Sequence, residues 1–260
     1  MKLSVKLITL CASLAIVGLM ITGPGEAAVD PGSVVGVWLM DGTANDYSGE
    51  GQDGAILGNP AWGDGKIGGA LELDGETHVE VPDSDATRVG TSHSATVWIK
   101  PNGVVGDWSR LVGKGAAGPR NFGLWRENAG FLLYQIYADG GNGNAWDNGN
   151  AVTQAPLDEW THMAGTYDGT EMILYVNGAP VFTTAFDLEP LTSEDPLTFG
   201  AAVAMHGWFL GSIDEIGVFK SVLSEEDVNT IMNDGLGAVV NLTAVSSQDK
   251  LAVTWGGIKE

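Results

Sequence analysis

The chain has 260 residues, with 33 acidic and 12 basic side chains, a formal net charge of −21 and 38 glycines. This length can form one large all-β domain and bury a sizeable core without disulfide bonds. The acidic balance argues against nucleic acid and anionic lipid as partners, because both require clustered lysine and arginine. It fits a soluble protein whose partners are neutral molecules or cations.

The first 27 residues have the features of a secretory signal peptide. Two lysines lie within the first six residues, an apolar run spans residues 7–21, and small residues follow. Cleavage after Ala27 would place the small residues Gly25 and Ala27 at positions −3 and −1, as signal-peptide cleavage sites require. The alternative is an uncleaved membrane anchor. We expect a secreted, periplasmic or cell-surface protein that is not inserted in a membrane after cleavage.

Residues 30–236 read as one all-β domain. Asp-Gly and Asn-Gly pairs punctuate this region, and both residue types tolerate the positive φ of tight hairpin turns. Runs between them alternate with period two, as in residues 94–100. We predict strands near residues 34–39, 69–73, 78–81, 94–100, 109–114, 121–126, 130–137, 160–167, 171–176, 180–186, 197–201 and 207–219. Many short strands with turns between them indicate two packed antiparallel sheets.

One helix is expected, near residues 225–233. The segment from Ser224 to Asp227 has the pattern of a capping box, and apolar residues at helical spacing follow it. Gly235 is placed to end the helix. Residues 237–260 differ in pattern and are predicted to form a C-terminal tail or an extra hairpin.

Four stretches in chain order resemble laminin-G-like domains of the concanavalin A-like jelly-roll type. These stretches are residues 38–54, 68–82, 159–178 and 211–227. The resemblance covers about residues 30–235 and implies a jelly-roll sandwich of two curved antiparallel sheets. It also implies a module that binds glycans or proteins, often with a structural calcium ion. Fold alone does not determine function.

An acidic, glycine-bent loop at residues 45–54 is the candidate calcium site. Calcium takes six to eight oxygen ligands, which Asp46, Asp53 and nearby carbonyl groups can supply. The resemblance adds Asp214, from the later Ile-Asp-Glu segment, to this set. The alternative is a solvated loop in which aspartates cap their own turns.

Three alternating acids, Glu72, Asp74 and Glu76, resemble the catalytic strand of laminarinase-type glycoside hydrolases. Such enzymes need paired carboxylates facing one cleft. Here Asp74 and Gly75 read as a hairpin turn, which would turn Glu76 away from the face occupied by Glu72.

Aromatic residues gather around a polar loop at residues 138–150. Sugar sites combine apolar ring faces with a few placed polar groups. The candidate ligand residues are Trp108, Trp125, Tyr137, Asn144, Trp146 and Asp147. The alternative is that the aromatic residues belong to the core and the loop is a plain connection. Arg120 and Arg126 are two of the few cations nearby and could contact an acidic sugar.

The favoured hypothesis is a secreted, non-catalytic module that binds a polysaccharide or a cell-surface glycan or protein and is stabilised by structural Ca²⁺. One alternative is a laminarinase-type hydrolase that uses Glu72, Asp74 and Glu76. Another is a self-assembling surface protein that docks through its C-terminal segment.

Overall fold

The computed structural model describes residues 29–115, 120–146, 151–202, 204 and 206–240. The expected signal peptide at residues 1–27 therefore lies outside the described residues. The same holds for residues 241–260 of the predicted C-terminal tail.

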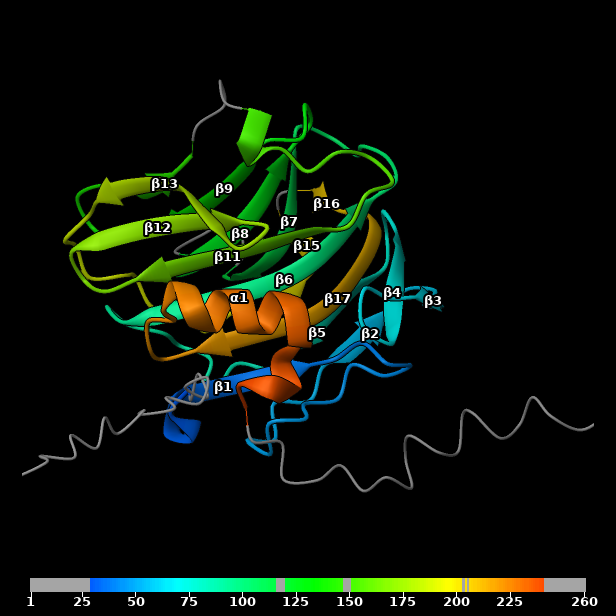
Figure 1. The fold of residues 1–260 in the computed structure, drawn as a ribbon, viewed down its shortest axis with the longest axis horizontal. Helices are drawn as coiled ribbons and strands as arrows, with labels where there is room; N and C mark the ends of the chain where they lie inside the picture. The colour runs from blue at the N-terminus through cyan, green and yellow to red at the C-terminus, as the bar shows by residue number, and fades with distance from the viewer. Residues whose placement is uncertain (1–28, 116–119, 147–150, 203, 205, 241–260) are drawn as a thin grey trace, which may run out of the picture.

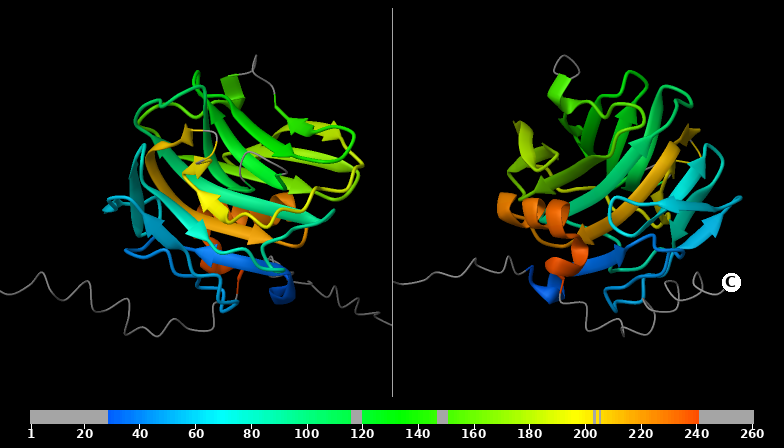
Figure 2. Two further views of the ribbon diagram at one scale, coloured as in Figure 1. Left: turned by 180° about the vertical axis from the view of Figure 1, so that it is seen from behind. Right: turned by 45° about the vertical axis from the view of Figure 1, so that its right-hand side comes forward.

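Two large antiparallel sheets pack face to face (Figures 1 and 2), which confirms the all-β jelly-roll sandwich. The first sheet has the order β13 (Ala179–Ala185), β12 (Glu171–Val176), β11 (Thr161–Tyr167), β6 (His93–Pro101), β17 (Leu210–Phe219), β4 (Gly69–Asp74) and β3 (Ala61–Asp64), and β1 (Val34–Trp38) also pairs with β17. The second sheet has the order β10 (Gly143–Ala145), β9 (Leu132–Ile136), β8 (Phe122–Glu127), β7 (Trp108–Lys114), β14 (Leu197–Phe199), β5 (His78–Val81) and β2 (Ala55–Leu57). The short strands β15 (Ala201–Ala202) and β16 (Gly207–Trp208) form a separate pair.

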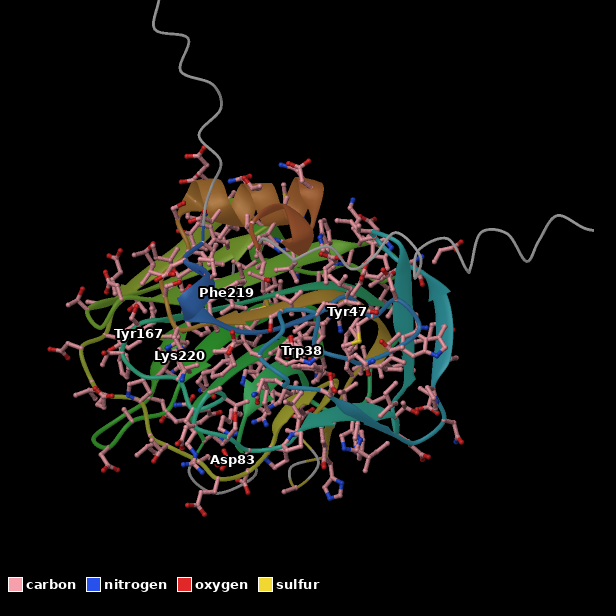
Figure 3. The ribbon with its side chains drawn as sticks, turned by 90° about the horizontal axis from the view of Figure 1, so that it is seen from below. Trp38, Tyr47, Asp83, Tyr167, Phe219 and Lys220 are labelled. Atoms are coloured by element: carbon pink, nitrogen blue, oxygen red, sulfur yellow. The ribbon has the colours of Figure 1, made fainter. Side chains whose placement is uncertain are left out.

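The hydrophobic core lies between the two sheets, as the alternating sequence pattern predicts. Residues such as Val97 and Ile99 from β6 and Leu124 from β8 point into it and are fully buried. Trp38 lies near its centre (Figure 3), with its ring 4.8 Å from that of Phe199 in an edge-to-face contact. Large, interlocking side chains of this kind hold the sandwich together in place of disulfide bonds.

The expected helix is α1 (Glu225–Asp234), and its capping box is present. Ser224 Oγ accepts a hydrogen bond from the Asp227 amide at 3.1 Å, and the Asp227 carboxylate accepts one from the Ser224 amide at 2.8 Å. Gly235, with φ of 85°, ends the helix. Short 3₁₀ helices are η1 (Pro31–Ser33), η2 (Ala151–Thr153) and η4 (Leu236–Ala238). In the described part of the chain, no helix is long and apolar enough to cross a membrane.

Helix α1 covers the outer face of the first sheet (Figure 1). Val228 and Ile231 of the helix share a second hydrophobic cluster with Tyr175 of β12. The first and last described residues, Val29 and Val240, belong to the same cluster. The outer face of the second sheet lies on the opposite side of the sandwich from the helix (Figure 2).

Candidate functional site

The candidate site is built on the outer face of the second sheet, where β7, β8, β9 and β10 lie side by side. Their register places outward-facing residues in two rows across the strands. One row runs through Arg110, Trp125 and Leu133, and the other through Gly113, Gly123, Gln135 and Asn144. Side chains on alternate positions face opposite sides of a sheet, so these rows point away from the core.

Two glycines paired across β7 and β8 form the floor of the site. A Cβ atom at Gly123 would collide with Nε1 of Trp125, and one at Gly113 would lie 3.0 Å from Nε of Arg110. Only glycine therefore lets the Trp125 indole and the Arg110 guanidinium lie flat on the sheet. The Arg110 Cζ atom lies 4.6 Å from the centre of the Trp125 ring, at cation–π distance.

A cavity of about 410 Å³ opens above these rows. It is lined by Trp108, Arg120, Trp125, Leu133, Gln135, Tyr137, Asn144 and Trp146. The structure thus brings together five of the six residues that the sequence singled out as candidate ligand contacts. The sixth, Asp147, lies outside the described residues.

The aromatic residues form the walls of this cavity. The ring centres of Trp108 and Trp146 lie 5.4 Å apart, with an interplanar angle of 68°. The guanidinium of Arg120 lies 3.9 Å from the Tyr137 ring centre and 5.8 Å from that of Trp125. Burial raises the pKa of Tyr137, so its phenol stays protonated at neutral pH, and burial lowers the pKa of the Arg120 guanidinium.

Polar groups complete the site. Gln135 Nε2 donates a hydrogen bond to Asn144 Oδ1, which joins β9 to β10 beside the rings. The indole nitrogens of Trp125 and Trp146 are buried and have no hydrogen-bond acceptor among the described residues. Nε1 of Trp125 lies against Gly123 of the sheet, so the indole offers its ring and not its N–H group to the cavity.

Sequence reasoning left out Arg110, Leu133 and Gln135. Period-two alternation back from Tyr137 would have given Leu133 and Gln135, because all three face the same side of the sheet. Of the two cations named with the loop, Arg120 lines the cavity. Arg126 does not, since its guanidinium donates to the carbonyl oxygen of Ala155 at 3.2 and 3.3 Å.

The acidic loop at residues 45–54 is organised by Asp46. The Asp46 carboxylate accepts hydrogen bonds from the amides of Val37, Ser48 and Gln52 at 2.9–3.0 Å. Asp53 Oδ1 in turn accepts one from the Asp46 amide at 2.8 Å. This is the turn-capping arrangement that was the alternative to a metal site.

Asp214 takes no part in that loop network. Its Oδ2 atom accepts hydrogen bonds from the amides of Lys66 and Ile67 at 2.8 and 3.0 Å, while Oδ1 is buried and has no hydrogen-bond partner in the described part of the chain. Burial raises the pKa of Asp214 to about 7. Within the described residues, no group of three or more His, Cys, Asp or Glu side chains is arranged to hold a metal. The predicted ligand set of Asp46, Asp53 and Asp214 is therefore not assembled, and calcium stays a prediction.

The acids at the end of β4 occupy a turn. Asp74 Oδ1 accepts hydrogen bonds from the amides of Glu76 and Thr77 at 3.0 and 2.7 Å, which lower the pKa of Asp74. Gly75 follows with φ of 86°. The alternation breaks at this point, as the sequence indicated. These three acids therefore do not form the straight, paired arrangement that the hydrolase alternative requires.

Comparison with known proteins agrees with this architecture. Mouse (Mus musculus) pappalysin-1 is 30% identical over 108 residues, which cover 39% of this chain and 7% of pappalysin-1. The chain thus spans only a small fraction of that curated relative.

Among solved structures, domain 4 of AbnA, a GH43 extracellular arabinanase from Geobacillus stearothermophilus in complex with arabinotriose, has a TM-score of 0.62. It is 21% identical, over 77% of this chain and 98% of that domain. The binding domain of Paraclostridial Mosquitocidal Protein 1 has a TM-score of 0.65 at 14% identity, over 78% of this chain and 52% of that one. At these identities the likeness establishes the fold. The family model Laminin_G_3 matches residues 73–229, more than half of the chain, and the chain therefore belongs to the concanavalin A-like lectin/glucanases superfamily.

Proposed function

We propose that this chain is a non-catalytic carbohydrate-binding module whose ligand occupies the cavity over β7–β10. The observation that carries this proposal is the convergence of Trp108, Trp125, Tyr137 and Trp146 on one cavity of about 410 Å³. Sugar rings present flat C–H faces that pack on aromatic rings, and their hydroxyl oxygens accept hydrogen bonds from buried donors. Gln135 and Asn144 supply polar side chains in the lining of this cavity.

Two further points support the proposal. Domain 4 of AbnA, which shares this fold, was solved in complex with the oligosaccharide arabinotriose, and AbnA is an extracellular enzyme. The expected signal peptide would also send this chain out of the cell, where polysaccharides and cell-surface glycans are found. We therefore propose an extracellular or cell-surface location.

The test is binding of the purified protein to a panel of polysaccharides by affinity electrophoresis, followed by titration calorimetry on any ligand found. Trp108→Ala and Trp146→Ala should each weaken binding by about tenfold or more, because a buried aromatic contact commonly supplies more than about 1 kcal/mol. Trp62→Ala is the matched control, since Trp62 is 38% exposed and lies on β3 of the other sheet. The proposal is wrong if no glycan binds, or if the two cavity variants bind as the control does.

A further inference from the structure

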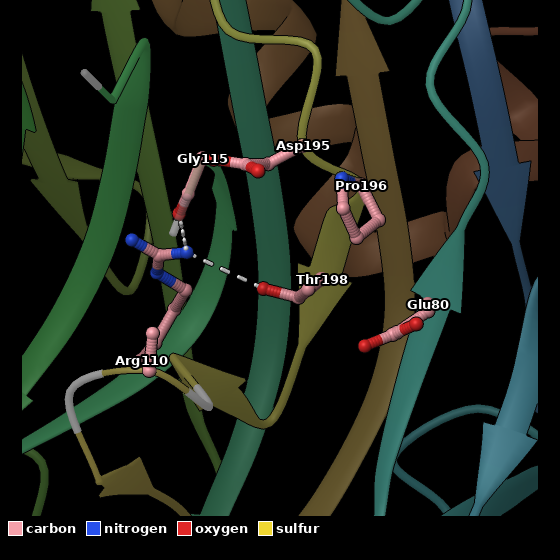
Figure 4. Close-up of a pocket in the computed structure, with 7 residues that line it drawn as sticks. Glu80, Arg110, Gly115, Asp195, Pro196 and Thr198 are labelled. Atoms are coloured by element: carbon pink, nitrogen blue, oxygen red, sulfur yellow. Dashed lines mark hydrogen bonds between the residues drawn. The ribbon is translucent and has the colours of Figure 1, made fainter. Parts of the chain in front are cut away.

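The wall between two neighbouring cavities carries two arginines. Arg110 lines a second, smaller cavity of about 220 Å³, together with Glu80, Gly115, Asp195, Pro196, Thr198 and Ala204 (Figure 4). Arg120 lines the aromatic cavity. Trp125 lies between them, with its ring centre 4.6 Å from the Arg110 Cζ atom and 5.8 Å from the Arg120 Cζ atom. We refer to Arg110, Trp125 and Arg120 as the arginine–tryptophan stack.

Arg110 is a fully buried cation, and among the described residues no carboxylate lies within ion-pair distance of its guanidinium, although Asp195 lines the same cavity and its negative charge acts on Arg110. Its Nη1 atom donates to the Gly115 carbonyl oxygen at 2.5 Å and contacts Thr198 Oγ1 at 3.5 Å. Burial lowers the pKa of Arg110 to about 10, so the side chain remains positively charged at neutral pH. A buried charge of this kind is costly unless an anion lies near it, and the Asp195 carboxylate in the same cavity offsets part of that cost.

The unused donors of Arg110 lie on one edge of its guanidinium. Nε and Nη2 are buried and have no hydrogen-bond partner within the described ranges. Figure 4 shows the two hydrogen bonds on the side of Gly115 and Thr198, with the other nitrogens directed away from Thr198 and Glu80. This edge is covered by protein, with Nε against Gly113, so Arg110 acts on a bound group through its charge and not by direct contact.

The described lining of the aromatic cavity includes one charged side chain. Of its eight lining residues, Arg120 is the charged one, and none carries a carboxylate. This contrasts with the whole chain, which has 33 acidic and 12 basic residues. At physiological ionic strength, distant surface carboxylates are screened over about 8 Å, so a group bound in this cavity feels the charge of Arg120 more strongly than that of the distant acids.

Building on the proposed function, we infer that the ligand is an acidic glycan, with a sugar carboxylate held against the arginine–tryptophan stack. Sugar rings pack on Trp108, Trp125 and Trp146, and the carboxylate of a uronic acid residue contacts Arg120. Arg110 adds a fixed positive charge behind Trp125.

The test compares uronic acid polymers with the same polymers after their carboxylates have been reduced to alcohols. Polygalacturonate, polyglucuronate and alginate are suitable, each beside its reduced form. At least one acidic polymer should bind about tenfold or more tightly than its reduced form, since a charge-assisted hydrogen bond contributes more than a neutral one. Raising the salt concentration should narrow this difference.

Variants assign the preference to the cavity. Arg120→Gln should remove most of the difference in affinity between acidic and reduced polymers, whereas Arg120→Lys should keep part of that difference. Lys66→Gln is the matched control, because the Lys66 Nζ atom lies 4.6 Å from the Trp98 ring on the other sheet. It should bind as the wild type does.

The outcomes separate the two proposals. If reduced polymers bind as tightly as acidic ones, or if Arg120→Gln keeps the full preference, the acidic ligand is wrong while the carbohydrate site stands. If the wider panel of neutral and acidic glycans shows no binding at all, the proposed function fails and the inference fails with it.

Discussion

The buried carboxyl group of Asp214 should make folding stability depend on pH in an unusual direction. Its Oδ2 atom holds the amides of Lys66 and Ile67, yet burial raises its pKa from 3.8 to about 7. Between these two values the folded protein keeps a proton that the unfolded chain has lost. The contribution of Asp214 to the free energy of unfolding is therefore fully present below about pH 4 and is lost as the pH rises to about 7.

The magnitude follows from the shift. A change of about 3 pKa units at about 1.4 kcal/mol per unit is worth about 4 kcal/mol of unfolding free energy at pH 8. Asp214→Asn carries no charge, and its amide oxygen can still accept the two backbone hydrogen bonds. We expect this variant to match the wild type within about 1 kcal/mol at pH 4 and to exceed its stability by up to about 4 kcal/mol at pH 8.

The assay is urea unfolding of both proteins at intervals between pH 4 and pH 8. Subtracting the wild-type free energy of unfolding from that of the variant at each pH cancels the contributions of other titrating groups. Asp168→Asn is the control of opposite sign, because hydrogen bonds from Thr170 and Glu171 lower the pKa of the exposed Asp168 carboxylate. A difference between Asp214→Asn and wild type that does not change with pH would refute the reasoning.

Four further outcomes are expected. Gly123→Ala should weaken glycan binding about tenfold or more in calorimetry, because the added methyl group displaces the Trp125 indole; unchanged binding would contradict the flat placement of the ring. Burial lowers the pKa of His162 to about 3, so the contribution of this residue to stability should fall as the pH drops below about 6.5. The stability of His162→Leu relative to the wild type should therefore rise over this range in urea unfolding, and a difference that stays constant with pH would count against it. Ser224→Ala should lower the free energy of unfolding by about 1 kcal/mol, because the helix cap is lost, and should lower the melting temperature by about 2–4 °C; an unchanged melting temperature would contradict this. The melting temperature of Asp214→Asn should respond to calcium and to EDTA as that of the wild type does; a wild-type response that vanished in the variant would restore Asp214 as a calcium ligand.

The sandwich could be predicted because its longer strands alternate cleanly and end at Asp-Gly or Asn-Gly turns. The helix at Glu225–Asp234 was equally accessible, because its cap is encoded within four neighbouring residues. Strands β2 (Ala55–Leu57), β3 (Ala61–Asp64) and β10 (Gly143–Ala145) escaped prediction. They have three or four residues each, which is too short for a clear alternating pattern, so their pairing depends on the neighbouring strand rather than on their own sequence.

The candidate site was only partly accessible from sequence. Tryptophan and tyrosine near a polar loop pointed to the strands that line the cavity, but Arg110 did not stand out, because arginine is usually exposed. The strand is also irregular there, with a shift of register between Arg110 and Val112. Asp214 was misplaced for a different reason. The Lys66 amide that donates a hydrogen bond to Asp214 lies 148 residues away in the sequence, and no local sequence pattern predicts such a contact.

The described chain enters and leaves the sandwich on one side. Val29 and Val240 both pack beneath α1, whereas the cavity opens on the opposite broad face. Closely placed ends on one surface are the arrangement that tolerates insertion into a larger polypeptide. Flanking domains attached there would leave the proposed sugar-binding surface uncovered. If that proposal holds, several such units in tandem could each bind a different stretch of one polymer and gain avidity without any new contact.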